Sequence, residues 1–151
     1  MNAVYRHTNI VANHWEQLAR FYEEVFGCVP SPPARDYRGD WLERCVGRPI
    51  NSVRGIHLLL PGHGDRGPTL EIFQYDPAET RQAPAANRPG FAHIAFSVDD
   101  VEGALAEVLA HGGGQLGEVI SMDVPDAGHI VLVYALDPEG NIVELQHWTR
   151  G

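Results

Sequence analysis

The sequence predicts an α+β fold made of two similar modules, each containing a strand, a helix and two or three further strands. Two observations support this prediction. Strand-like alternation passes into helical spacing twice, in residues 4–27 and again in residues 91–113. Each module also ends in an apolar strand with a glutamate two residues in and an aromatic residue four residues later, TLEIFQY at 69–75 and IVELQHW at 142–148. A twofold internal repeat is therefore expected.

Each module contains one predicted amphipathic helix. Asn13 and Asp99 are the expected N-caps, because each lies six residues after a histidine and has a glutamate three residues later, in capping-box spacing. Gly27 and Gly112 are expected to end the helices. The apolar stripes consist of Trp15, Leu18, Ala19, Tyr22, Val25 and Phe26 in the first helix, and of Val101, Ala104, Leu105, Val108 and Leu109 in the second.

The remaining segments are read as middle strands and loops. Residues 51–62 and 128–140 are strand-like and end in turn residues. Residues 30–41, PSPPARDYRGDW, are rich in proline and charge, which is typical of a mobile flap over a pocket or of a simple exposed loop. Residues 77–90 are rich in proline and alanine without periodicity, which predicts a connection between the modules.

With 151 residues the chain has the length of one domain. We therefore expect residues 1–151 to form a single domain, with module one at 1–76 and module two at 91–151.

Composition excludes several classes of function. The net charge is −9, and eleven arginines occur without any lysine or basic cluster, which argues against nucleic acid and anionic membrane partners. Without lysine there is no Schiff-base chemistry. Two cysteines, no signal-peptide pattern and no long apolar run favour a cytoplasmic protein. The expected partners are a small molecule and a second copy of the chain, because open sheets leave edges that a homodimer would cover.

Strand alternation places four chemically active side chains on the mixed faces of the sheets. His7 shares a face with Asn9, Glu71 with Phe73 and Tyr75, His93 with Phe91, and Glu144 with Trp148. The opposite faces are more uniformly apolar and are expected to pack against the helices, through Leu70, Ile72, Ile94, Phe96, Val98, Val143 and Leu145.

The set His7, Glu71, His93 and Glu144 suits a divalent metal ion. Two neutral imidazoles and two carboxylates are ligands for Zn, Ni, Co, Mn or Fe(II), and the cation would offset the cost of burying the glutamates. Taken singly, each histidine is more often a core or rim residue and each glutamate an edge-strand charge. Their repeat-related placement as a set favours the metal.

Five stretches resemble the vicinal oxygen chelate superfamily: YRHTNI, FYEEVFG, TLEIFQY, GFAHIAFSVDD and DPEGNIVELQHW. Its members include glyoxalase I, methylmalonyl-CoA epimerase, extradiol dioxygenases, fosfomycin-resistance transferases and bleomycin-binding proteins. The resemblance covers nearly the whole chain and implies the glyoxalase-like fold, in which two βαβββ modules form open mixed sheets that curve around a metal pocket. It implies ligands at His7, Glu71, His93 and Glu144, a pattern most similar to that of glyoxalase I.

The resemblance also implies candidates for the substrate pocket. Middle strands border the cavity in this family, so His57 and His129 are candidates for a pocket-facing acid or base, whereas His147 alternates to the other face and is interpreted as structural. The aromatic candidates, which are more often core residues in general, are Phe73, Tyr75, Phe91, Tyr134 and Trp148.

Three functions remain open, because a fold does not determine chemistry. The leading one is a metal-dependent lyase or isomerase of glyoxalase I or epimerase type, which stabilises an enediolate or enolate of a small carbonyl substrate, with Glu144 or Glu71 as the base. Against an epimerase, methylmalonyl-CoA epimerases usually have Gln at the place of Glu71. The second is an Fe(II) or Mn(II) extradiol-type dioxygenase, and the third a non-enzymatic antibiotic-binding resistance protein that uses Trp148, Tyr75 and Phe91.

Overall fold

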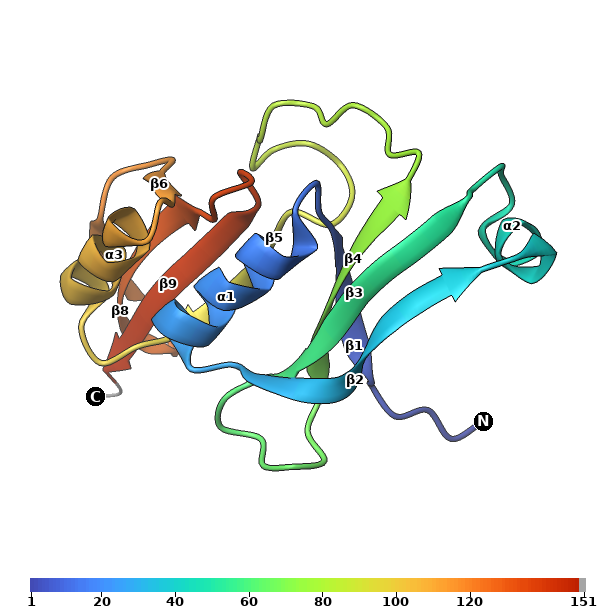
Figure 1. The fold of residues 1–151 in the computed structure, drawn as a ribbon. Coiled ribbons are helices and arrows are strands. Elements are labelled where there is room, and N and C mark those ends of the chain that lie inside the picture. Colours follow the sequence, from blue (N-terminus) through green and yellow to red (C-terminus); the bar gives the residue numbers. More distant parts are fainter. Residues whose placement is uncertain (150–151) are drawn as a thin grey trace. The chain divides into compact units, whose positions relative to one another are not determined.

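The computed structural model describes residues 1–149 and divides the chain into two compact units, Met1–Arg81 and a second that begins at Gln82 (Figure 1). The first unit contains β1 (His7–Val11), α1 (Trp15–Phe26), β2 (Val29–Arg38), α2 (Asp40–Val46), β3 (Ser52–Leu59) and β4 (Thr69–Asp76). The second contains β5 (His93–Ser97), α3 (Val101–Ala110), β6 (Gly114–Gln115), β7 (Ile120–Val124), β8 (Gly128–Leu136) and β9 (Ile142–Thr149). The predicted α+β class is confirmed.

Each unit is built around one sheet. The first sheet has the strand order β1-β4-β3-β2, and the second has the order β5-β9-β8-β6, with β7 also paired to β8. In both, the first strand of the unit pairs in parallel with the last, while the other pairs are antiparallel. The two strands that carry the predicted ligands of each module are therefore hydrogen-bonded neighbours.

The helices cover the apolar face of each sheet, as the alternation predicts. Leu70 and Ile72 of β4 and Val143 and Leu145 of β9 are buried. Helix α1 packs on β3 and β4, and α3 packs on β8 and β9. Burial of one such aliphatic side chain contributes about 1.5 to 3 kcal/mol, so this face holds the sheets to their helices. The opposite face of each sheet is left for the histidines and glutamates.

The helix starts differ from the prediction. The N-cap of α1 is His14, not Asn13, and its side chain makes no capping hydrogen bond. The N-cap of α3 is Asp100, not Asp99, because its Oδ1 lies 3.1 Å from the backbone nitrogen of Glu102 and accepts that hydrogen bond. Two adjacent aspartates have the same capping chemistry, and only the backbone conformation selects between them.

The helix ends agree more closely with the prediction. Gly27 is the C-cap of α1 in the left-handed conformation, with φ 67°. Helix α3 ends at Ala110 with His111 as its C-cap, and Gly112 follows in the left-handed region with φ 84°. Glycine adopts this conformation without the steric cost that a Cβ atom adds.

The expectation of a loop at residues 30–41 is wrong. Most of this segment is β2, an edge strand, and the helix α2 follows it at Asp40. Proline is tolerated in an edge strand, where its missing N–H is not needed for pairing. The register between β2 and β3 also shifts between Ser31 and Arg35, and the Pro32–Pro33 pair lies within this irregularity.

Helix α2 covers part of the mixed face of the first sheet. A small hydrophobic cluster consists of Leu42, Ile50, Val53 and Phe73, with Val46 and Tyr75 packed against it. Phe73 lies directly opposite Gly55 in the pairing of β3 with β4. A Cβ atom at Gly55 would lie 2.5 Å from the Phe73 ring and 2.0 Å from the carbonyl oxygen of Ile72. Gly55 therefore leaves room for the Phe73 ring and for the close approach of the β4 backbone.

Replacing Gly55 by alanine is expected to destabilise the protein, because the new methyl group clashes with the backbone carbonyl of Ile72 and with the Phe73 ring. Overpacking of this kind costs about 1 to 3 kcal/mol. Urea denaturation followed by circular dichroism measures the change in the free energy of unfolding. The matched control is Gly117→Ala, where no atom lies within 4 Å of the added Cβ. Equal stability of both variants would contradict the packing role of Gly55.

Candidate metal centre

The first unit brings together two histidines and a glutamate from three adjacent strands. His7 comes from β1, Glu71 from β4 and His57 from β3. Because β4 lies between the other two strands, Glu71 is directly opposite His57 on one side, and His7 is opposite Thr69 on the other, two residues earlier. One ligand atom from each of His7, His57 and Glu71 lies within 4.8 Å of the others.

The carboxylate of Glu71 is largely buried and well supplied with polar partners. Its side chain is 13% exposed. Oε1 lies 2.8 Å from Nε2 of His57, and Oε2 lies 3.6 Å from Nε2 of His7. Oε2 also accepts a hydrogen bond from Nδ2 of Asn9 at 2.8 Å. These partners offset part of the loss of hydration that burial of a carboxylate would otherwise incur.

His57 is held from both sides of its ring. Its Nδ1 lies 2.9 Å from the Thr69 hydroxyl oxygen, and its Nε2 faces Glu71. Burial lowers the pKa of His57, the charge of Glu71 opposes this effect, and Arg35 and His7 add to it. The imidazole is thus favoured in its neutral form, in which one ring nitrogen donates a hydrogen bond and the other accepts one.

The second unit contains a simpler version of this arrangement. Nε2 of His93 in β5 lies 3.1 Å from Oε2 of Glu144 in β9, and the Glu144 side chain is 13% exposed. Tyr134 of β8 is directly opposite Glu144, and its ring centroid lies 5.1 Å from that of His93. Each predicted ligand pair, one histidine with one glutamate, is therefore in contact within its own unit.

The structure adds two residues that the sequence reasoning missed as members of the site. Strand alternation places Asn9 on the face of His7 but does not predict its contact with Glu71, and it does not single out Thr69. The available signal was the alternation Thr69–Glu71 on one strand and His7–Asn9 on another. Its meaning depends on the parallel register between the two strands, which local spacing does not reveal.

The predicted pocket aromatics have different surroundings. Phe73 is buried, with its ring edge-on to His57 at a centroid distance of 6.2 Å, and Tyr75 packs beside it. Burial and the charge of Glu71 raise the pKa of Tyr75, which keeps its phenol protonated. Phe91 and Trp148 are exposed, and the Trp148 indole donates to the Gln146 side chain.

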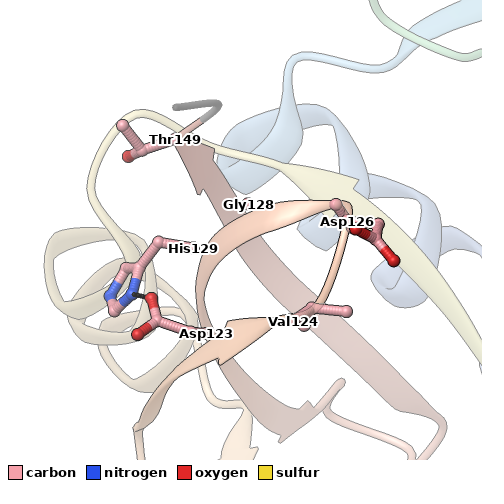
Figure 2. Close-up of a pocket in the computed structure, with 7 residues that line it drawn as sticks. Asp123, Val124, Asp126, Gly128, His129 and Thr149 are labelled. Atoms are coloured by element: carbon pink, nitrogen blue, oxygen red, sulfur yellow. Dashed lines mark hydrogen bonds and ion pairs between the residues drawn. The ribbon is translucent and has the colours of Figure 1, made fainter.

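His129 and His147 of the second unit lie away from the contact between His93 and Glu144. His147 binds the carbonyl oxygen of Val98 through Nδ1 at 2.8 Å, in keeping with a structural role. His129 lies between Asp123 and Ser121, and Figure 2 shows its ring directed at the Asp123 carboxylate. An open hollow at the β7–β8 turn is lined by Asp123, Val124, Asp126, Ala127, Gly128, His129 and Thr149, which include none of the predicted metal ligands.

Comparison with known proteins identifies the family. Residues 6–132 match the family model of the Glyoxalase/Bleomycin resistance protein/Dioxygenase superfamily. The chain belongs to this superfamily. Its members include metal-dependent isomerases, dioxygenases and resistance proteins, and they usually bind a divalent metal ion. No curated protein matches the sequence.

Solved structures of the superfamily share the fold. A glyoxalase family protein from Bacillus cereus is 20% identical with a TM-score of 0.79, over 99% of this chain and 97% of that one. A glyoxalase family protein from Enterococcus faecalis is 21% identical in sequence, with a TM-score of 0.60, and the match covers 95% of this chain and 96% of that one. The fosfomycin resistance protein FosX from Listeria monocytogenes is 14% identical in sequence, with a TM-score of 0.58, and the match covers 100% of this chain and 94% of that one.

None of the helices within residues 1–149 has the length and hydrophobicity needed to cross a membrane.

The lowered pKa of His57 predicts that acidification destabilises the metal-free protein. Below the ordinary value of 6.5 the unfolded chain takes up a proton at this position, whereas the folded chain does so only at lower pH. Stability therefore falls as the pH drops through this window. Urea midpoints at about pH 7.5 and about pH 5.5 should differ more for the wild type than for His57→Gln. His63→Gln, in a loop, controls for the loss of one imidazole, and an equal pH response of wild type and His57→Gln would refute the assignment.

Proposed function

We propose that the protein is a metal-dependent lyase or isomerase of glyoxalase I or epimerase type, acting on a small carbonyl substrate. The observation that carries this proposal is the pairing, in each unit, of a largely buried glutamate with an imidazole nitrogen: Glu71 with His7 and Glu144 with His93. A carboxylate is kept in such surroundings at a considerable cost in hydration unless a positive charge compensates it. Members of this superfamily typically act on small molecules and often form dimers.

The proposed ligands of the ion are His7, Glu71, His93 and Glu144. Their nitrogen and oxygen atoms suit Zn, Ni, Co, Mn or Fe(II), and two carboxylates neutralise a dipositive ion. When bound, the ion would supply Lewis acidity that stabilises negative charge on a carbonyl oxygen of the substrate. We further propose a homodimer, because β1 and β5 are edge strands of their sheets.

The base in this proposal is one of the two glutamates, Glu144 or Glu71, and we favour Glu144. Within residues 1–149 its carboxylate forms a single ion pair, with His93, whereas that of Glu71 is in contact with His7, His57 and Asn9. A carboxylate with fewer fixed partners can turn toward a proton next to the substrate carbonyl. It would remove that proton and return it to a different carbon or to the opposite face.

Metal-dependent exchange of the proton next to a carbonyl tests this function. Purified protein is loaded with each candidate metal and incubated in deuterated water with a panel of α-keto hemithioacetals and thioesters. NMR should show that at least one of these compounds exchanges the hydrogen next to its carbonyl for deuterium. Glu144→Gln should slow the exchange by about 100-fold or more, because it removes the base. Glu118→Gln, at an exposed position, is the matched control. No exchange across the panel by the metal-loaded wild type would contradict the proposal.

A dioxygenase is the second candidate, and one observation favours it. His7, His57 and Glu71 form a set of two histidines and one carboxylate within the first unit, the ligand type of non-haem Fe(II) oxygenases. Such an enzyme consumes one O₂ per catechol cleaved. The Fe(II)-loaded protein would then take up oxygen stoichiometrically in an oxygen-electrode assay, and His57→Ala would abolish the uptake. The absence of uptake across a catechol panel would rule out this candidate.

A third candidate is a non-enzymatic antibiotic-binding protein. Antibiotic binding that persists after a chelator has removed the metal would identify it.

A further inference from the structure

We propose that Asn9 and Thr69 are positioning residues that hold the Glu71 carboxylate in one orientation toward the metal, Asn9 directly and Thr69 by way of His57. This inference rests on the proposed function, since it concerns the same metal site. Neither residue is a proposed ligand. Both act through a neighbour, Asn9 through the carboxylate of Glu71 and Thr69 through the imidazole of His57.

Asn9 restricts the rotation of the Glu71 carboxylate. It lies directly opposite Glu71 in the pairing of β1 with β4. Its Nδ2 donates to Oε2 of Glu71 at 2.8 Å and approaches the backbone carbonyl oxygen of the same residue at 3.4 Å. His57 engages the other oxygen, Oε1, at 2.8 Å. With one donor on each oxygen, the plane of the carboxylate is set, and Oε2 is directed to the side where His7 lies.

Thr69 restricts the ring of His57. Its hydroxyl lies 2.9 Å from Nδ1, and Thr69 shares a face of β4 with Glu71, two residues away. When the hydroxyl donates to Nδ1, the proton of the neutral imidazole is on Nε2, and Nε2 donates to Glu71. The Glu71 carboxylate, which only accepts hydrogen bonds, selects this tautomer, and the Thr69 hydroxyl fixes the orientation of the His57 ring, as hydrogen-bond partners of metal-binding side chains commonly do.

The internal repeat provides a comparison for this arrangement. The second unit has the same strand pairing, so each position has a counterpart. Ala95 is opposite Glu144 as Asn9 is opposite Glu71, and Ile142 is opposite His93 as Thr69 is opposite His7. Tyr134 takes the place of His57. The backbone therefore does not require polar residues at these positions, and the polar set is a feature of the first unit.

This difference separates the roles of the two glutamates. Glu71, held by donors at both oxygens, is suited to remain a fixed ligand throughout the reaction. Glu144 has a methyl group and an aliphatic chain at the corresponding positions, from Ala95 and Ile142. The asymmetry of the outer partners thus supports the assignment of Glu144 as the glutamate that moves.

The experiment removes the asparagine next to Glu71 in one variant and adds an asparagine next to Glu144 in another. Asn9→Ala removes the donor to Glu71, and Ala95→Asn introduces an asparagine at the matching exposed position of the second unit. Dissociation constants for Zn²⁺ are measured by competition with a chromophoric chelator, and the absorption spectrum of the Co²⁺-loaded protein reports ligand geometry. Asn9→Ala should weaken Zn²⁺ binding by about 10-fold to 100-fold, the usual effect of removing an outer partner. Ala95→Asn should leave Zn²⁺ binding at least as tight and slow the proton exchange.

Thr69 supplies a second, independent test. Thr69→Val removes the hydroxyl while keeping the side-chain shape, and should also weaken Zn²⁺ binding by about 10-fold or more. Thr69→Ser restores the hydroxyl and should restore the affinity, which a purely structural role of the methyl group would not predict. Thermal unfolding of the metal-free variants shows whether each one folds.

The outcomes distinguish this inference from the proposed function. A wild-type protein that binds none of the candidate ions overturns both. The positioning roles alone are overturned by a different result. In that case the wild type binds Zn²⁺ and exchanges the substrate proton, and the folded variants Asn9→Ala and Thr69→Val keep the wild-type Zn²⁺ affinity and Co²⁺ spectrum.

Discussion

The parallel pairing of the first and last strands within each unit is the constraint on which the candidate site depends. In the first unit it sets His7 opposite Thr69, and in the second it sets His93 opposite Ile142. The glutamates follow two residues later on the same face, at Glu71 and Glu144. A register shift by one residue would turn each glutamate toward the helices, because side chains alternate between the faces of a sheet. Contact between imidazole and carboxylate is thus a consequence of the register.

The same alternation makes the two faces of each sheet chemically different. One face buries aliphatic residues against α1 or α3 and stabilises the unit. The other face carries the polar residues, and in the first unit α2 covers part of it through the cluster around Phe73. Phe73 and Glu71 are two residues apart on that face, so the cluster borders the polar group. The buried aliphatic residues of β4 and the candidate metal ligand Glu71 thus lie on opposite sides of one strand.

The two halves keep the backbone of the repeat and differ in its side chains. Around Glu71 the first half has Asn9, His57 and Thr69, which together hold the carboxylate. Around Glu144 the corresponding positions are Ala95, Tyr134 and Ile142. A duplicated scaffold therefore yields one restrained and one less restrained carboxylate. In the proposed function the restrained carboxylate would remain a ligand, and the less restrained one would serve as the base.

The fold class and the repeat were predictable from the sequence, because alternation of period 2 and helical spacing are local properties. The segment at residues 30–41 was not, since proline enrichment looks like a loop until the strand is known to be at a sheet edge. The observed N-caps each lie one residue after the predicted Asn13 and Asp99. Asp100 has the same capping chemistry as Asp99, whereas His14 is the N-cap through its backbone conformation alone, since its side chain makes no capping hydrogen bond.

The sequence by itself determined which side chains share a face, and so it placed the histidines and glutamates on the sides of the sheets away from the helices. Only the tertiary structure decided that Asn9 contacts Glu71, 62 residues later in the chain, and that Thr69 reaches His57. The physical reason is that contacts between strands depend on which strands pair and in what register. Strand pairing and register arise from packing of the whole unit and cannot be read from the spacing of residues within one strand.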